Sequence, residues 1–443
     1  MKNILVLGAG FVAEPLVEYL NRRSENSITV ASYLLEEAEQ LASKFEQVEA
    51  IQLDVTNQEL ITNALSEYDL VVSLVPAPFH PTIAKAAIDA KVSMVTASYE
   101  SNDMRALADD IEAAGIVVLN EIGLDPGIDH LSAMQIIEEA QAKGDSIETF
   151  VSWCGGLPAP EFNNNPLGYK FSWAPKGVLT ALLNEAKYLR EYEAITVSSE
   201  NLMDWAKPLT IADLSLEGYP NRESISYKDV YGIGSVASIL RGTLRYQGFS
   251  EIIKGAYQLG LLSMQKQDFD VQSWKDFVLK INQVSDLEKL KATISDHAVA
   301  ALEWLGCFSE STITQKNTPI DVFCELLIEK LKYLENETDM VVLQHKFVAQ
   351  KNNGEEYFIS STLKAIGDIK GYSAMSKTVG YPAAIASQLI LDGVYKGKGL
   401  KLPVTKDMYE PVLAALAKEG IVCEEQFFTA KEVDKKQFLS ELN

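Results

Sequence analysis

Apolar and polar residues follow two different periods along the N-terminal third of the chain. Short apolar runs rich in β-branched residues predict strands, because strands buried on both faces of a parallel sheet carry few polar positions. Between them, apolar residues recur every three to four positions, which predicts amphipathic helices. The predicted strands are Ile4–Leu7, Ile28–Ala31, Glu49–Leu53, Leu70–Val75, Val92–Thr96 and Ile116–Leu119. The predicted helices are Val12–Leu20, Leu35–Phe45, Gln58–Leu65, His80–Ala90 and Met104–Ala114.

This alternation predicts an α/β fold, with a Rossmann-type, doubly wound parallel sheet and helices on both of its faces. Right-handed crossovers in such a sheet place the ligand in a crevice at the carboxyl ends of the strands. Side chains that directly follow each predicted strand are therefore the candidates for binding and catalysis.

The pattern changes after Asn120, where residues 121–173 are rich in Gly, Pro and Asn. Helical periodicity dominates residues 250–334, and alternating residues in Met340–Val348 and Glu356–Lys364 predict an antiparallel pair of strands. Two more helices are predicted, at Tyr381–Leu391 and about Met408–Lys418. We expect a dinucleotide-binding domain at 1–127 with about 383–443 packed back on it, a second α/β domain at 128–249 and 335–382, and a helical subdomain at 250–334.

The first predicted strand runs into a turn of the form G-x-G-x-x-A, and a predicted helix follows it. In dinucleotide-binding folds the first glycine permits the tight turn and the second lets the backbone approach the pyrophosphate. The small third residue allows the helix to pack closely, and the anion lies at the positive end of that helix. The sequence therefore predicts cofactor contacts from Gly8, Gly10, Phe11, Val12 and Ala13.

The second predicted strand ends at Ser32 and Tyr33, with neither an acidic nor a basic residue. An NAD enzyme normally carries Asp or Glu at this place, so its absence favours NADP over NAD. Ser32 can bond either a ribose hydroxyl or a phosphate. We interpret Glu36 and Glu37 as solvated residues in the first turn of the following helix, not as ribose ligands.

Polar side chains follow the later strands as well. Asp54, with Val55, stands either at the adenine contact or as a cap before Asn57, and we leave both open. The nicotinamide side of the crevice is expected to be lined after the fourth strand by Ser73, Leu74 and Val75, and after the sixth by Leu124 and Asp125. Ser98 and Tyr99 follow the fifth strand, so that with Asp125 they form a plausible polar active site.

Composition narrows the classes of function. The chain has 443 residues, 47% of them hydrophobic, and a formal net charge of −23, which argues against a nucleic-acid partner. It has no apolar stretch long enough for a membrane helix, and it begins on its first strand, so we expect no signal peptide. Four scattered cysteines and four dispersed histidines predict no metal site and reduced thiols in the cytoplasm.

Several longer motifs resemble one family, the glutamate-forming saccharopine dehydrogenases, also called saccharopine reductases. The similarity spans nearly the whole chain, in the segments Val95–Tyr99, Gly123–His130, Cys154–Glu161, Asn164–Trp173, Gly218–Arg222, Arg241–Tyr246, Asp339–His345 and Gly371–Pro382. The resemblance implies a Rossmann domain, an α/β substrate-binding and dimerisation domain, a small helical domain and a homodimer. It also implies oxidation of the secondary amine of saccharopine to an imine, and hydrolysis to glutamate and 2-aminoadipate 6-semialdehyde, in lysine metabolism.

The resemblance also assigns roles to residues. Saccharopine carries three carboxylates, and an arginine fork matches a carboxylate in a bidentate way, so Arg222 and Arg245 are the expected anchors. Further substrate contacts are implied for Ser98, Tyr99, Asp125, Lys170, Thr243 and Leu244. Asp125, Tyr99 and Cys154 match positions with acid–base or positioning roles. Covalent catalysis by Cys154 is disfavoured, because imine hydrolysis needs no enzyme nucleophile.

Two other functions stay open on the sequence. A related enzyme that joins another amine to another aldehyde would keep the glycine turn, but it would not need two arginines for carboxylates. A silent NAD(P)H-binding protein could have lost Tyr99, Asp125 and the arginines, all of which are present. The direction of the reaction, biosynthetic or degradative, is also left open.

Overall fold

The computed structural model describes residues 1–314 and 316–442, which form two compact units. Unit 1 comprises Met1–Lys143 and Tyr372–Glu424, and unit 2 comprises Gly144–Gly371 and Glu425–Asn443. The division after Lys143 lies later in the chain than the expected boundary at residue 127, because helix α7 (Ile128–Ala142) belongs to unit 1.

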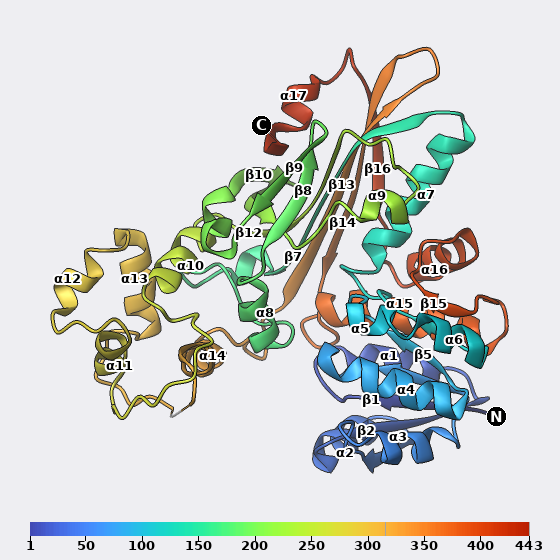
Figure 1. The fold of residues 1–443 in the computed structure, drawn as a ribbon, viewed down its shortest axis with the longest axis horizontal. Coiled ribbons are helices and arrows are strands. Elements are labelled where there is room, and N and C mark those ends of the chain that lie inside the picture. The colour runs from blue at the N-terminus through green and yellow to red at the C-terminus, as the bar shows by residue number, and fades with distance from the viewer. Residues whose placement is uncertain (315, 443) are drawn as a thin grey trace. The chain divides into compact units, whose positions relative to one another are not determined.

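Unit 1 is built on a seven-stranded sheet in the order β15-β6-β5-β4-β1-β2-β3, with every neighbouring pair parallel (Figure 1). Its strands are β1 (Lys2–Leu7), β2 (Asn26–Ser32), β3 (Val48–Gln52), β4 (Leu70–Ser73), β5 (Ser93–Thr96), β6 (Val117–Leu119) and β15 (Gly399–Lys401). The doubly wound α/β fold and its six predicted strands are confirmed. The seventh, β15, was missed because Gly399–Lys401 is too short to show a pattern.

Helices connect these strands where the periodicity predicts them, with one interruption. They are α1 (Ala13–Asn21), α2 (Leu35–Ala42), α3 (Gln58–Leu65), η1 (Ala77–Phe79), α4 (His80–Ala90), α5 (Asn102–Arg105) and α6 (Ala108–Ala114). The predicted helix Met104–Ala114 is thus two short helices. The first is capped by Ser101, whose side chain accepts a hydrogen bond from the N–H of Met104.

Two C-terminal helices pack within unit 1. The first, α15 (Ala374–Leu391), lies so close to α1 that a Cβ on Gly380 would come within 2.9 Å of the Val12 carbonyl oxygen. The second, α16 (Lys406–Lys418), is joined to α7 by a 2.7 Å hydrogen bond that the Tyr409 hydroxyl donates to Glu138. Residues 425–443, in contrast, belong to unit 2, because β16 (Glu424–Thr429) pairs with a strand of its sheet.

Unit 2 contains a mixed nine-stranded sheet with the main path β10-β11-β12-β7-β13-β14-β16. Its other strands are β7 (Ser146–Pro158), β8 (Ala186–Arg190), β9 (Glu193–Val197), β10 (Lys207–Ile211), β11 (Leu214–Pro220), β12 (Ser238–Tyr246), β13 (Asp339–Gln350) and β14 (Glu356–Ile366). The predicted antiparallel pair is confirmed, since β13 and β14 run antiparallel with Met340 opposite Ile366.

Among the described residues, five helices of unit 2 follow β12 and precede β13 along the chain, as the periodicity of residues 250–334 predicts, and Figure 1 shows them on one side of the sheet of this unit. They are α10 (Phe249–Gln258), α11 (Trp274–Ile281), α12 (Leu287–Lys291), α13 (Asp296–Leu305) and α14 (Pro319–Lys330). The other helical segments of unit 2 are η2 (Pro160–Phe162), α8 (Pro175–Ala181), η3 (Ser199–Trp205), α9 (Tyr227–Val230), α17 (Lys435–Phe438) and η4 (Ser440–Leu442).

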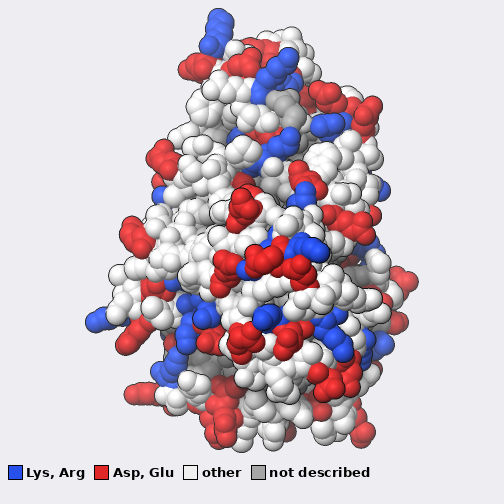
Figure 2. All heavy atoms as spheres, turned by 90° about the vertical axis from the view of Figure 1, so that its left-hand side faces the viewer, with Lys and Arg blue, Asp and Glu red and all other residues white. Residues whose placement is uncertain are grey.

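Charged side chains are mixed on the surface. Figure 2 shows one face of the molecule, where Lys and Arg are interspersed with Asp and Glu and are not gathered into a basic tract. An anionic ligand therefore needs cations fixed at its own site, as the net charge of −23 implies. Across residues 1–314 and 316–442, no helix combines the length and the apolar character that crossing a membrane requires.

Candidate active site

The glycine turn after β1 leaves room for a ligand next to the backbone. Gly8 has φ +103°, and a Cβ there would lie 3.2 Å from the Leu74 carbonyl carbon, so a side chain is excluded on both counts. A Cβ on Gly10 would meet nothing within 4 Å. This open space, followed directly by the N-terminus of α1, fits the pyrophosphate of a dinucleotide. Phe11 is 63% exposed beside the turn.

The end of β2 differs from the sequence interpretation in one respect. The Ser32 hydroxyl donates a 2.9 Å hydrogen bond to a carboxylate oxygen of Glu37 in the first turn of α2. Glu37 is exposed in the first turn of α2, as interpreted from the sequence, but its carboxylate also stands at this strand end. Tyr33 is 66% exposed, and its main-chain oxygen accepts a bond from Gln52.

At the end of β3, Asp54 stabilises its own turn. One carboxylate oxygen accepts bonds from the hydroxyl and the N–H of Thr56, at 2.7 and 2.9 Å, and these bonds lower the pKa of Asp54 below its ordinary value. The cap of α3 is instead Asn57, whose side chain accepts from the N–H of Leu60. Asp54 is thus not the helix cap, and its adenine contact, like that of Val55, stays a prediction.

The ends of β4 and β5 are joined by a buried histidine. His80, at the start of α4, lies with Nδ1 3.1 Å from the Ser73 hydroxyl and Nε2 2.8 Å from the Ser98 hydroxyl. The Thr96 hydroxyl is 3.1 Å from the same Nε2. Burial lowers the pKa of His80 to about 4, so the imidazole is neutral near pH 7. The sequence alone does not show this contact between His80 and Ser98.

This histidine is expected to make stability depend on pH. In the unfolded chain His80 takes up a proton near pH 6.5, but in the folded protein only near pH 4. Between these values the unfolded chain binds the extra proton, so stability falls as the pH falls, by about 2–3 kcal/mol between pH 6.5 and 4.5. His80→Asn should flatten this part of the pH profile of the urea midpoint. An unchanged profile in the variant would contradict the assignment.

The loop after β6 carries Asp125, which accepts a 2.9 Å hydrogen bond from the Tyr99 hydroxyl. The conformation of this loop requires glycine at position 127, because a Cβ on Gly127 (φ +146°) would overlap the backbone of Gly123. Behind it, a buried carboxylate oxygen of Glu121 lies 2.8 Å from Nε2 of His130. Two of the predicted active-site residues, Tyr99 and Asp125, are therefore in direct contact.

In unit 2, Arg245 of β12 is a buried cation, only 7% exposed. Its guanidinium lies over the rings of Tyr169 and Phe249, 4.9 and 5.2 Å from their centroids. The carboxylate of Glu217, the cross-strand neighbour of Arg245, is occupied by the N–H groups of Gly248 and Ser250. Within the described residues the guanidinium forms no ion pair with a carboxylate; it donates to the Leu244 carbonyl, and its Nε has no partner.

Lys170, in contrast, already has an internal partner. Its Nζ lies 2.5 Å from a carboxylate oxygen of Glu337, and both side chains are more than nine-tenths buried. Burial alone would raise the pKa of Glu337, but hydrogen bonds from Lys170, the Leu334 N–H and the Asn164 side chain outweigh it and lower the pKa. The substrate contact of Lys170 stays a prediction. A substrate that contacts Lys170 would have to do so while Lys170 is paired with Glu337.

The other predicted residues of unit 2 lie on or near the same sheet. Cys154 of β7 is buried and is the register partner of Thr243 on β12. Leu244 is fully buried next to Arg245. Arg222, just after β11, is exposed and has a left-handed backbone, φ +51°. Sequence reasoning missed Glu337, Tyr169 and Phe249. Glu337 and Tyr169 are distant in sequence from their partners Lys170 and Arg245, so no local pattern links them.

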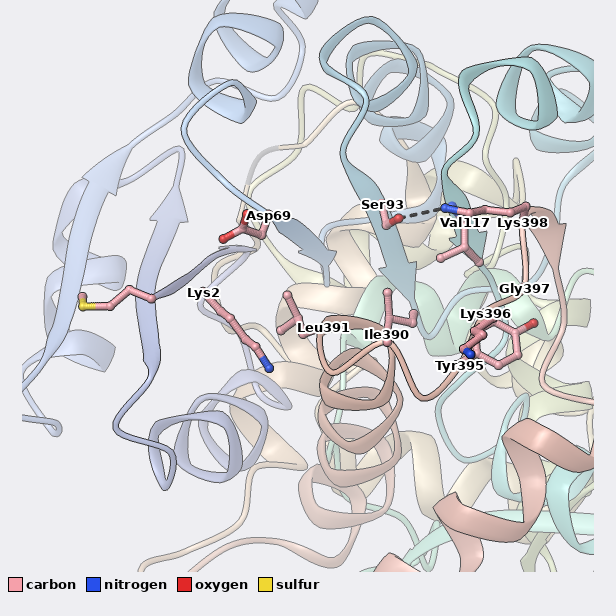
Figure 3. A pocket seen from close by; sticks show the side chains of 12 residues that line it. Lys2, Asp69, Ser93, Val117, Ile390, Leu391, Tyr395, Lys396, Gly397 and Lys398 are labelled. Carbon is pink, nitrogen blue, oxygen red and sulfur yellow. Dashed lines mark hydrogen bonds between the residues drawn. The ribbon is translucent and has the colours of Figure 1, made fainter.

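A cavity of about 430 Å³ lies at the opposite edge of the sheet in unit 1 (Figure 3). Lys2, Asp69, Ser93 and Val117, at or just before the amino ends of β1, β4, β5 and β6, contribute to its lining. The remaining lining residues are Met1, Ile390, Leu391, Gly393, Tyr395, Lys396, Gly397 and Lys398. The ligand crevice of this fold is at the carboxyl ends, so the cavity is separate from the candidate site.

Comparison with known proteins decides the family. Residues 4–119 match the family description "Saccharopine dehydrogenase NADP binding domain", and residues 123–421 match "Saccharopine dehydrogenase C-terminal domain". The chain belongs to the saccharopine dehydrogenase family. It is 42% identical, over 96% of this chain and 99% of the relative, to "Saccharopine dehydrogenase [NADP(+), L-glutamate-forming]" of Saccharomyces cerevisiae.

Other members of the saccharopine dehydrogenase family agree in sequence and structure. The solved apo structure of histidine-tagged saccharopine dehydrogenase (L-Glu forming) from the same yeast superposes with a TM-score of 0.88, covering 97% of this chain and 100% of that one. The mitochondrial α-aminoadipic semialdehyde synthase of Mus musculus is 40% identical over 95% of this chain, which corresponds to 47% of its own length. The resemblance read from the motifs is confirmed.

Proposed function

We propose that this chain is a saccharopine dehydrogenase of the L-glutamate-forming type. It uses NADP or NAD to interconvert saccharopine with L-glutamate and 2-aminoadipate 6-semialdehyde in lysine metabolism. We further propose that it acts in the cytoplasm as a homodimer. The reaction and the preference for NADP are supported by the names of relatives that match over nearly their full length.

The observation that carries the substrate class is the buried guanidinium of Arg245. Keeping an unpaired charge buried costs several kcal/mol, roughly, unless a counter-ion arrives with the ligand. A substrate carboxylate supplies that counter-ion, and the stacked guanidinium presents donors in a fixed plane. Saccharopine has three carboxylates, so we assign one to Arg245 and a second to the exposed Arg222.

Positioning explains most of the proposed chemistry. When bound, NADP or NAD would supply the acceptor for the hydride that leaves the carbon next to the substrate's secondary amine. The resulting imine takes up water and separates into glutamate and the semialdehyde. We assign to Asp125 the role of accepting a proton from the amine or orienting that water, and its hydrogen bond from Tyr99 supports this assignment. Cys154 is assigned a positioning role in the substrate pocket.

Removing the Asp125 carboxylate should affect turnover more than binding. Asp125→Asn is expected to lower kcat by about 10²–10³-fold with a smaller change in KM, since a group that moves a proton acts mainly in the transition state. Tyr99→Phe, which removes the hydroxyl that bonds to Asp125, should cost about tenfold in kcat. Steady-state kinetics with saccharopine tests both variants. A Tyr99→Phe defect larger than that of Asp125→Asn would reverse these roles.

The reverse reaction tests the choice of substrate. NADPH oxidation should require both L-glutamate and 2-aminoadipate 6-semialdehyde, and Arg222→Ala should raise KM for these substrates. Replacing glutamate by an amine without carboxylates should abolish turnover, because Arg245 would then remain unpaired. Equal rates with such an amine would instead indicate an enzyme for another amine–aldehyde pair. Tight NADPH binding without turnover on any pair would indicate a silent binder.

A further inference from the structure

The carboxyl end of β2 lies next to the glycine turn. The Gly8 N–H donates a 2.8 Å hydrogen bond to the Ala31 carbonyl, and Ser32 is the next residue along the strand. In a dinucleotide-binding sheet this strand end faces the adenosine ribose, where NAD has a 2′-hydroxyl and NADP a 2′-phosphate. Residues at this point therefore decide between the two cofactors.

A carboxylate occupies this point. Glu37, in the first turn of α2, accepts the 2.9 Å hydrogen bond from the Ser32 hydroxyl. Its neighbour Glu36 is equally exposed, but its side chain forms no hydrogen bond or ion pair with any residue that the structure describes. Only one of the two glutamates is thus held at the strand end, although both are in the same helical turn.

No cation from this stretch of sequence balances that charge. Residues 24–43 contain four glutamates and neither Lys nor Arg. The next cation, Lys44, pairs with Glu14 at 2.5 Å. A 2′-phosphate at Ser32 would therefore approach a carboxylate with no Lys or Arg from the same stretch, whereas a 2′-hydroxyl can donate a hydrogen bond to that carboxylate.

We propose that Glu37 is a specificity-determining residue for the cofactor. Its carboxylate, held on Ser32, opposes the 2′-phosphate of NADP and accepts a hydrogen bond from the 2′-hydroxyl of NAD. The chain therefore uses NAD as well as NADP, although its N-terminal domain matches an NADP-binding family. The inference rests on the proposed function only in requiring a dinucleotide cofactor.

Calorimetric titration of the full chain with NADPH and NADH tests this inference without any saccharopine. Glu37→Gln should tighten NADPH binding about tenfold and leave NADH binding unchanged or weaker, since it removes one nearby negative charge. Glu36→Gln is the matched control, from the same helical turn, and should change the ratio of the two dissociation constants less than twofold. The difference between Glu37→Gln and the unmodified chain should shrink at about 0.5 M salt, because mobile ions screen exposed charges.

The titrations distinguish a failure of the Glu37 inference from a failure of the proposed function. If the ratio of the NADPH and NADH dissociation constants of Glu37→Gln stays within twofold of that of the unmodified chain, the inference is overturned. An equal change of this ratio in Glu36→Gln would overturn it as well. A chain that binds both cofactors with the expected shift but does not oxidise saccharopine would overturn the proposed substrate and leave the role of Glu37 standing.

Discussion

Arg245→Met is expected to lower kcat/KM for saccharopine by about 10³-fold, because a buried guanidinium–carboxylate contact is worth roughly 4 kcal/mol when one partner is removed. Methionine keeps much of the side-chain volume between Tyr169 and Phe249. Since the substitution also removes a buried charge whose Nε has no partner, stability should be unchanged or raised. Steady-state kinetics and thermal unfolding measure the two effects.

Two controls separate substrate binding from a general defect. Arg190→Ala removes an arginine of the same unit whose guanidinium donates a 3.5 Å hydrogen bond to the Leu442 main-chain oxygen, and should leave kcat/KM within about twofold. The NADPH affinity of Arg245→Met should equal that of the unmodified chain. Activity within threefold of the unmodified chain would remove Arg245 from the substrate site, and an equal loss of NADPH affinity would point to misfolding.

The two glycines of the turn should respond differently to alanine. Gly10→Ala is expected to weaken NADPH binding about 10²-fold with little change in thermal stability, since the added Cβ meets no protein atom within 4 Å but fills the place where the pyrophosphate approaches. Gly8→Ala should weaken NADPH binding and also lower thermal stability, because φ +103° and the backbone of Leu74 leave no room for a side chain.

Calorimetric titration with NADPH and thermal unfolding of both variants make the comparison. If Gly10→Ala bound NADPH as tightly as the unmodified chain, the pyrophosphate would have to lie elsewhere. If Gly8→Ala kept its full stability, the left-handed backbone of the turn would be wrong.

Periodicity predicts this fold well in segments whose own apolar pattern shows which side chains are buried. Six of the seven strands of the first sheet and the antiparallel pair β13–β14 follow from their apolar patterns, since in such segments the order of apolar and polar residues shows which positions are buried. Elements that depend on distant partners were not predictable. Gly399–Lys401 becomes a strand only by pairing with β6, and β16 carries mostly exposed residues, so neither shows an apolar period.

The residues of the candidate site also fall into those that the sequence predicts and those that depend on distant partners. Strand ends and glycine spacing identify Gly8, Ser98 and Asp125 from the sequence, because the geometry of parallel sheets fixes where such residues lie. The Ser32–Glu37 contact was not predictable from the sequence, since side-chain rotamers decide which glutamate turns back to the strand. The partners of Lys170 and Ser98 depend on tertiary structure: Glu337 is 167 residues from Lys170, and the role of His80 emerges only where β4 and β5 lie side by side.

The most direct test of the central claim is the absorbance at 340 nm after saccharopine is added to the chain with NADP⁺ or NAD⁺. The account predicts an increase that requires saccharopine, is accompanied by an equal amount of L-glutamate, and is abolished in Arg245→Met. No increase with either cofactor, in a chain shown by calorimetry to bind NADPH, would contradict it.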